Sequence, residues 1–188
     1  IIRGKLARSR GDGDDPHQRV ILRPLITQEA LAFVDSRQGK ALALAGPLTP
    51  DHLIRTKGLP LWIDRPAFDD PAEFSEQLTK AIAAYAGDYD EYLKRNLGTG
   101  PIPEDVDRLP IVLLLPGLGA VCSGWDANAA EIARDIVEQT IRAKTQTARL
   151  EVPYCGPEEK SLFEMEFHLF QREKIRKTVS QRAEGKTA

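Results

Sequence analysis

Apolar and polar residues follow one another along this chain in blocks that predict helices and short strands in turn. The most regular block is a long helix, which Asp70 caps, Pro71 opens and Gly98 ends, with apolar residues at steps of three, four or seven. A second long helix begins after Asp126, whose residue type is favoured as an N-cap. The apolar stripe of the first helix comprises Phe74, Leu78, Ile82, Tyr85, Tyr89, Tyr92 and Leu93, and that of the second comprises Ala129, Ile132, Ala133, Ile136, Val137, Thr140 and Ile141.

Shorter blocks complete the pattern. Thr27 and Thr49 stand where N-caps are expected, and they predict helices over residues 28–34 and 50–55. A last helix is predicted over residues 157–176, with Leu162, Phe163, Phe167 and Phe170 on its apolar side. Strands are predicted at residues 20–22, 41–45, 59–64, 111–115 and 150–152. Strands that alternate with helices predict an α/β fold, which we expect to be a layered α/β/α sandwich without a complete Rossmann domain.

The segment after the apolar run at residues 111–115 is rich in glycine and leads into the second long helix. We expect a strand, a loop and a helix here, because such a junction presents backbone N–H groups that can hold an anion. The lysine of a phosphate-binding loop is absent from this segment, and Cys122 stands where a dinucleotide-binding loop has its third glycine. The candidate ligand-binding residues in this segment are Gly117, Gly119, Ser123 and Gly124.

The densest group of polar residues lies at residues 49–57. On the predicted short helix, Asp51 and Arg55 share a face, His52 lies one turn before Thr56, and Lys57 follows at the end. Two interpretations stay open. Asp51, His52, Arg55 and Lys57 could bind a carboxylate or a phosphate through charge-assisted hydrogen bonds. Alternatively, Asp51 and Arg55 pair with each other and Lys57 is solvated, which is the interpretation we prefer.

Three further features permit either a structural or a chemical role. The tyrosines of the first long helix are interpreted as core residues with hydroxyls at the rim, and the alternative is a platform for a sugar or a base. Cys122 is interpreted as a buried structural cysteine rather than a reactive thiol, because no histidine is near it in the sequence. The histidines, His17, His52 and His168, are scattered, so no metal site and no catalytic residue are predicted.

Composition restricts the class of protein. The 188 residues are 41% apolar and 29% charged with a formal net charge of −2, which describes a soluble globular protein and names no nucleic-acid partner. No apolar run approaches the roughly 20 residues that span a bilayer, so no membrane partner is expected. Two widely spaced cysteines and the lack of a signal-like segment favour the cytoplasm.

Charge and composition also suggest divisions along the chain. Both ends are rich in arginine and lysine, so we interpret residues 1–24 as a basic extension or linker and residues 177–188 as a basic tail. Residues 25–176 between them are the predicted α/β domain. The first residue, Ile1, and the loop composition of residues 10–16 favour a chain that begins within a longer protein.

Three motifs in order resemble a known family. Residues 46–57, 115–119 and 163–167 are similar to the middle portion of fused class II aldolase/short-chain dehydrogenase proteins, which include the rhamnulose-phosphate aldolase/alcohol dehydrogenase type. The resemblance implies a class II aldolase-like layer and a parent protein that uses zinc and NAD. Within it, Pro116 stands where a class II aldolase has a zinc-binding histidine, and the family's His-x-His pair has no counterpart.

The resemblance implies a role in carbohydrate metabolism. We expect a non-catalytic or accessory module that acts as a scaffold or an oligomerisation unit, with no cofactor of its own. The expected partners are flanking domains of the same protein and further copies of the chain in a homo-oligomer. The alternative is a module that binds a sugar phosphate or another anion through the Asp51–Lys57 segment and the Gly117–Gly124 loop.

Overall fold

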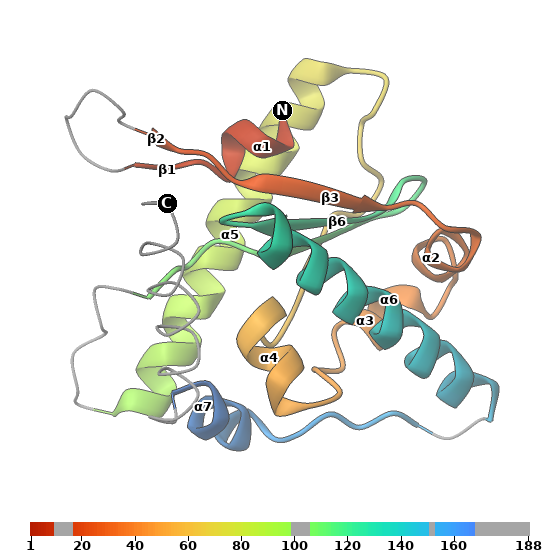
Figure 1. Ribbon diagram of the computed structural model, residues 1–188, viewed down its shortest axis with the longest axis vertical. Coiled ribbons are helices and arrows are strands. Elements are labelled where there is room, and N and C mark those ends of the chain that lie inside the picture. The colour runs from red at the N-terminus through yellow and green to blue at the C-terminus, as the bar shows by residue number, and fades with distance from the viewer. Residues whose placement is uncertain (10–16, 99–105, 151–152, 168–188) are drawn as a thin grey trace, which may run out of the picture.

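A computed structural model describes residues 1–9, 17–98, 106–150 and 153–167 of the chain. Its main body is a four-stranded mixed sheet between two layers of helices (Figure 1). The helices are α1 (Ile2–Lys5), α2 (Gln28–Val34), α3 (Gly39–Ala43), α4 (Pro50–Thr56), α5 (Pro71–Leu97), α6 (Ala127–Arg149) and α7 (Glu159–Phe167). The strands are β1 (Arg8–Ser9), β2 (His17–Gln18), β3 (Ile21–Leu25), β4 (Leu61–Trp62), β5 (Val112–Leu115) and β6 (Gly119–Gly124).

The order of the strands in the main sheet is β3-β6-β5-β4, and β1 and β2 form a separate pair. β6 is antiparallel to both β3 and β5, whereas β4 is parallel to β5. The expected α/β/α layering is confirmed. A sheet whose central pair is antiparallel is not the parallel sheet of a doubly wound Rossmann domain.

The two central strands supply both halves of the core because side chains alternate between the faces of a strand. Val112 and Leu114 of β5 pack towards α6, whereas Leu113 and Leu115 pack towards α5. β6 continues both clusters in the same way, and all four residues of β5 are buried. Figure 1 shows the consequence, with α5 and α6 on opposite faces of the sheet.

Most of the predicted helices form for the reasons read from the sequence. Asp70 accepts hydrogen bonds from the backbone N–H groups of Ala72 and Glu73 at the start of α5, at 2.9 and 3.0 Å. The caps of α2, α4 and α6 are Thr27, Thr49 and Asp126, and each accepts from a backbone N–H of the first turn. Phe74, Leu78 and Ile82 of α5 pack on one side of the sheet and Ala133, Val137 and Ile141 of α6 on the other, so these parts of the predicted stripes are confirmed.

Two predicted elements are wrong. Residues 41–45 were expected to be a strand, but residues 39–43 form helix α3. Alternating alanine and leucine mimics the period of a strand, yet neither residue is β-branched and both favour helices.

The second wrong element is the loop expected at residues 117–124. Gly119–Gly124 is strand β6, joined to β5 by the turn at residues 116–118, so the glycine-rich segment does not start the helix. The glycines are needed because other backbones approach β6 closely. A Cβ on Gly119 would lie 2.5 Å from the carbonyl oxygen of Leu25, and one on Gly124 would lie 2.2 Å from the backbone nitrogen of Ala130.

The two ends of the described chain differ in part from the prediction. Residues 1–24 were interpreted as an extension, yet Leu6 and Val20 are 1% and 2% exposed and lie in the core, and β3 begins at Ile21. Leu150 follows α6 as its C-cap, and residues 151–152 of the predicted strand lie outside the described residues. The last helix is described from Glu159 to Phe167, and its predicted remainder, with Phe170, also lies outside them.

The close approach of β6 to α6 gives a testable prediction. Gly124→Ala should lower the free energy of unfolding by about 2 kcal/mol or more, because the new methyl group would overlap the backbone of α6. Urea denaturation measures the change. Gly87→Ala is the matched control: Gly87 lies within α5 with open space around it, so alanine should raise the free energy of unfolding by about 0.5–1 kcal/mol. Equal effects of the two substitutions would contradict this packing.

Candidate functional site

The polar segment at residues 49–57 forms helix α4 and the residue that ends it. The backbone N–H of His52 donates to Thr49 Oγ1 at 3.2 Å, and Pro50 occupies the first turn, so the helix starts as predicted. It ends at Lys57, whose φ of 66° and ψ of 173° lie in a backbone region that glycine normally occupies. The change of direction at Lys57 takes its side chain into the protein.

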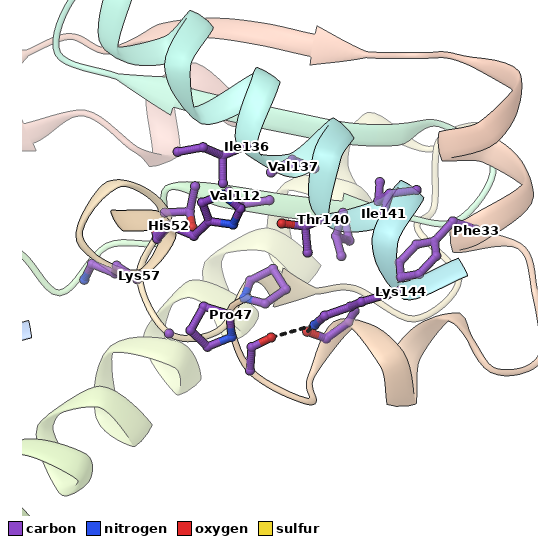
Figure 2. A pocket seen from close by; sticks show the side chains of 16 residues that line it. Phe33, Pro47, His52, Lys57, Val112, Ile136, Val137, Thr140, Ile141 and Lys144 are labelled. Carbon is purple, nitrogen blue, oxygen red and sulfur yellow. Dashed lines mark hydrogen bonds between the residues drawn. The ribbon is translucent and has the colours of Figure 1, made fainter. Parts of the chain in front are cut away.

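The four candidate residues of this segment do not all face solvent together. Asp51 is exposed, His52 and Arg55 are half-buried, and Lys57 is only 8% exposed. His52 and Lys57 line a cavity between α4, α6 and β5, and Figure 2 shows the Lys57 side chain extending away from the other labelled residues. Nδ1 of His52 is buried and has no hydrogen-bond partner among the described residues. Burial lowers the pKa of His52, and the neighbouring Asp51 acts in the opposite direction.

The cavity is small. Its volume is about 50 Å³, whereas a single water needs about 10–15 Å³ by this measure and pockets for organic ligands begin at about 300 Å³. It has room for a few waters but not for a sugar phosphate.

The candidate residues of the glycine-rich segment make their contacts within the chain. The backbone N–H of Gly117 donates to the carboxylate of Asp35 at 2.7 Å, so the anion at this turn is the chain's own. Ser123 is 5% exposed, and its Oγ donates to the carbonyl oxygen of Ile111 at 3.1 Å. Gly119 and Gly124 pack against backbone, and none of the four glycine-segment residues lines the cavity beside α4 as the structure describes it.

A buried lysine of α6 was missed in the sequence. Lys144 is 1% exposed, and its ammonium donates to the carbonyl oxygens of Leu42 and Gly46, both at 2.7 Å, and of Ala43 at 3.4 Å. Burial lowers its pKa to about 8. Three carbonyls match the three N–H donors of an ammonium, so Lys144 joins α6 to the end of α3. Its position three residues after Ile141, on the apolar stripe, could have indicated burial.

A second polar group surrounds the tyrosine row of α5. We call it the tyrosine cluster, and it consists of Tyr85, Tyr89 and Tyr92 with Lys57 and Glu166. The ammonium of Lys57 donates to the carbonyl oxygen of Asp107 and lies 4.0 Å from the ring centre of Tyr89. The hydroxyl groups of Tyr89 and Tyr92 both donate to the carboxyl group of Glu166, the second at 3.1 Å. Lys57, at the end of α4, and Glu166, in α7, therefore hold the tyrosine row in place.

Desolvation changes the acid–base behaviour of the tyrosine cluster. It lowers the pKa of Lys57 to about 7, with Glu166 acting against the change and Arg8 and Arg108 adding to it. Burial also raises the pKa of Glu166, although the two tyrosine hydroxyls and Lys57 oppose this. The charged forms of both side chains are thus disfavoured by their surroundings. Groups of this kind in a concave region mark a candidate site.

A groove with aromatic residues in its walls runs past the tyrosine cluster. It lies between β4, α5 and α7, and its volume is about 660 Å³. Trp62, Tyr85, Tyr89, Tyr92 and Glu166 are among the residues that line it. The volume falls within the range of about 300–1,000 Å³ that is usual for small-molecule sites. The groove, rather than the α4 segment or the glycine-rich segment, is the candidate site that the geometry favours.

The surroundings of Cys122 decide between its two interpretations. Cys122 is fully buried in β6, and desolvation raises the pKa of its thiol to about 12, so the interpretation as a structural cysteine is confirmed. Within the described part of the chain, no three His, Cys, Asp or Glu side chains come together as a metal site would require. His168 lies outside the described residues. No helix of the described ranges is both long and apolar enough to cross a membrane.

The buried amine of Lys57 predicts a pH dependence of stability. In the unfolded chain its pKa is near 10.5, so between pH 7 and that value the unfolded state binds more protons than the folded state. Stability should therefore rise from pH 7 to pH 8.5, with Lys57 contributing up to about 1.4 kcal/mol per pH unit. Lys144 adds a slope of the same sign near the upper end.

Urea denaturation of Lys57→Met at a series of pH values tests this assignment. The variant should lose most of the rise between pH 7 and pH 8, because the group that titrates there is gone. Lys80→Met is the matched control, since Lys80 is an exposed lysine of α5 paired with Glu76, and it should keep the full rise. A Lys57→Met variant with the slope of the parent chain would contradict a buried, partly neutral amine at this position.

Comparison with known proteins agrees with the fold. The model of a family described as "Aldolase class II, second domain" matches residues 1–175. A protein of Bacillus subtilis (strain 168) named "Uncharacterized oxidoreductase YuxG" is 34% identical over 114 residues, which are 60% of this chain and 16% of that protein. No solved structure matches the chain. Since the family model covers nearly all of the described fold, this chain belongs to the class II aldolase second-domain family.

Proposed function

We propose that this chain is an accessory module, without a catalytic centre of its own, of a larger carbohydrate-metabolising protein that joins class II aldolase and short-chain dehydrogenase domains. The family match supports the aldolase part of this proposal. The relative whose printed name is an oxidoreductase, of which this chain spans 16%, supports the dehydrogenase part.

The observation that carries the proposal is the place of the glycine-rich segment in the sheet. In an anion-binding or cofactor-binding junction, backbone N–H groups at the start of a helix point towards the ligand. Here the residues Ala120, Val121 and Cys122 are 5% exposed or less in β6, whose partners are β3 and β5. The backbone of this segment makes the hydrogen bonds of the sheet, which supports a module that does not bind NAD at this segment.

We expect no zinc site of the class II aldolase type at the β5–β6 turn either. The resemblance places Pro116 at the position of a histidine ligand, and proline has no side-chain lone pair for a metal. Asp35 is the acidic side chain at this turn, and it accepts the hydrogen bond of Gly117. The residues at this turn therefore support no metal-dependent step.

Hydrogen bonds of polar side chains between distant elements support a scaffold role. Lys144 fixes α6 to the end of α3, and Asp35 fixes the end of α2 to the β5–β6 turn. Several large apolar side chains nevertheless remain exposed, among them Ile26 at 55% and Leu150 at 74%. Exposed apolar residues on a well-packed domain are candidates for contact with flanking domains or with further copies of the chain.

The experiment is a thermal-unfolding series on the purified chain with zinc, NAD or a rhamnulose phosphate, combined with an assay for aldol cleavage. We expect each ligand to change the melting temperature by less than about 1 °C, and no cleavage with zinc present, because only a ligand that binds the folded state adds stability, by RT ln(1 + c/Kd) at a free ligand concentration c.

The result that contradicts the proposal is a clear stabilisation or turnover. A shift of several degrees with zinc would establish a metal site. A shift with the sugar phosphate that Arg55→Ala abolishes, and that the exposed control Arg37→Ala retains, would instead support the anion-binding role of the Asp51–Lys57 segment.

A further inference from the structure

The groove between β4, α5 and α7 has walls suited to a flat apolar molecule. Trp62 of the edge strand β4, Tyr85 and Tyr92 of α5, and Leu162 of α7 all line it (Figure 1 shows α7 beside α5). The Tyr85 hydroxyl donates to the carbonyl oxygen of Leu59 at 2.9 Å. Since this bond fixes the ring, the aromatic wall is held in place before any ligand enters.

One polar group in the groove retains capacity for a further hydrogen bond. The carboxyl group of Glu166 receives the Tyr89 hydroxyl on Oε1 and the Tyr92 hydroxyl on Oε2. In its ionised form, which the two hydroxyls and Lys57 favour against burial, the carboxylate has about four acceptor positions, so two donors leave about half of them for others. Glu166 also lines the groove, and its surroundings desolvate it. A donor on a bound molecule would complete its hydrogen bonding.

The charges around the groove argue against an anionic ligand. The two cations that line it are both paired, Lys40 with Asp64 at 2.5 Å and Arg95 with Glu159 at 2.8 Å. Lys57 lies against the ring of Tyr89 and is not among the residues that line the groove. A phosphate would therefore face the carboxylates of Asp88 and Glu166 without a free cation among the described lining residues.

We propose that this groove binds a small, uncharged, flat molecule that is mostly apolar and carries a hydroxyl or amino donor, which Glu166 accepts. The aromatic walls set the shape, the paired rim charges exclude phosphorylated compounds, and Glu166 fixes the orientation. This inference is independent of the accessory role, because a ligand in the groove needs neither zinc nor NAD nor the α4 segment.

The test uses 2-naphthol and 2-methoxynaphthalene, which have nearly the same shape but differ in the donor. Ligand-observed NMR with the full chain should show binding of 2-naphthol, with the methyl ether at least about fivefold weaker because it cannot donate to Glu166. Glu166→Gln should reduce this preference to about twofold or less. Glutamine offers one acceptor oxygen in place of two, and the hydroxyls of Tyr89 and Tyr92 already require it.

A pair of neighbouring alanines on α5 supplies the matched control. Ala84 lines the groove, and Ala83 is exposed beside it but is not a lining residue. Ala84→Trp should place a bulky ring in the groove and weaken binding of 2-naphthol at least about tenfold, whereas Ala83→Trp should leave it unchanged. Both positions face solvent, so neither substitution threatens the core.

Three results would overturn the inference. Equal binding of 2-naphthol to the Ala83→Trp and Ala84→Trp variants would show adventitious adsorption elsewhere on the chain. Equal affinity for the hydroxyl and methoxy compounds would remove Glu166 as the acceptor. Preferential binding of methyl glucoside would assign the groove to polyhydroxylated ligands instead. None of these results would change the melting experiments that test the proposed function. Failure of this inference can therefore be told apart from failure of the proposed function.

Discussion

The close approach of backbone at the two ends of β6 is the constraint on which the rest of the structure depends. Gly119 lies against the carbonyl of Leu25, and Gly124 lies against the first turn of α6. Only glycine permits both contacts, so β3 can pair along β6 and α6 can start directly above the sheet. With α6 placed on one face and α5 on the other, β5 and β6 become the shared centre of both core clusters.

The polar interior strengthens the same arrangement. Lys144 binds three carbonyl oxygens at the end of α3, and Lys57 and Glu166 both contact the tyrosine row. These charged groups are used to join elements that are distant in sequence. Their burial has a cost, which appears as lowered lysine pKa values and a raised glutamate pKa. Among the described residues, Glu166 borders the groove beside α7, whereas Lys57 and Lys144 border the small cavity beside α4.

Much of the fold follows from local signals in the sequence. The caps Thr27, Thr49, Asp70 and Asp126 locate four helices, and the run at residues 111–115 locates the central strand. The elements that could not be read locally depend on tertiary contacts. α3 forms where alanine and leucine alternate, and its last carbonyls bind Lys144 from a distant helix. β6 resembles a ligand loop because its glycines, needed for close packing, are also the residues that such loops require.

The candidate site was harder to predict from the sequence than the fold was. The preferred interpretation of Lys57 as a solvated lysine is wrong, because the backbone turn at that residue buries the side chain, and the sequence does not reveal this turn. Glu166 lies 74 residues from Tyr92, and only the packing of α7 on α5 brings them together. The tyrosine row was interpreted as core with hydroxyls at the rim, and the structure adds the groove that those rings border.

Amide hydrogen exchange of residues 119–124 tests the central claim most directly, which is that the glycine-rich segment is a structural strand. If it is, these amides should exchange only through global unfolding, with a free energy of opening equal to that measured by denaturation. Exchange as fast as that of an exposed loop, or protection that appears only when an anion or NAD is added, would contradict the account.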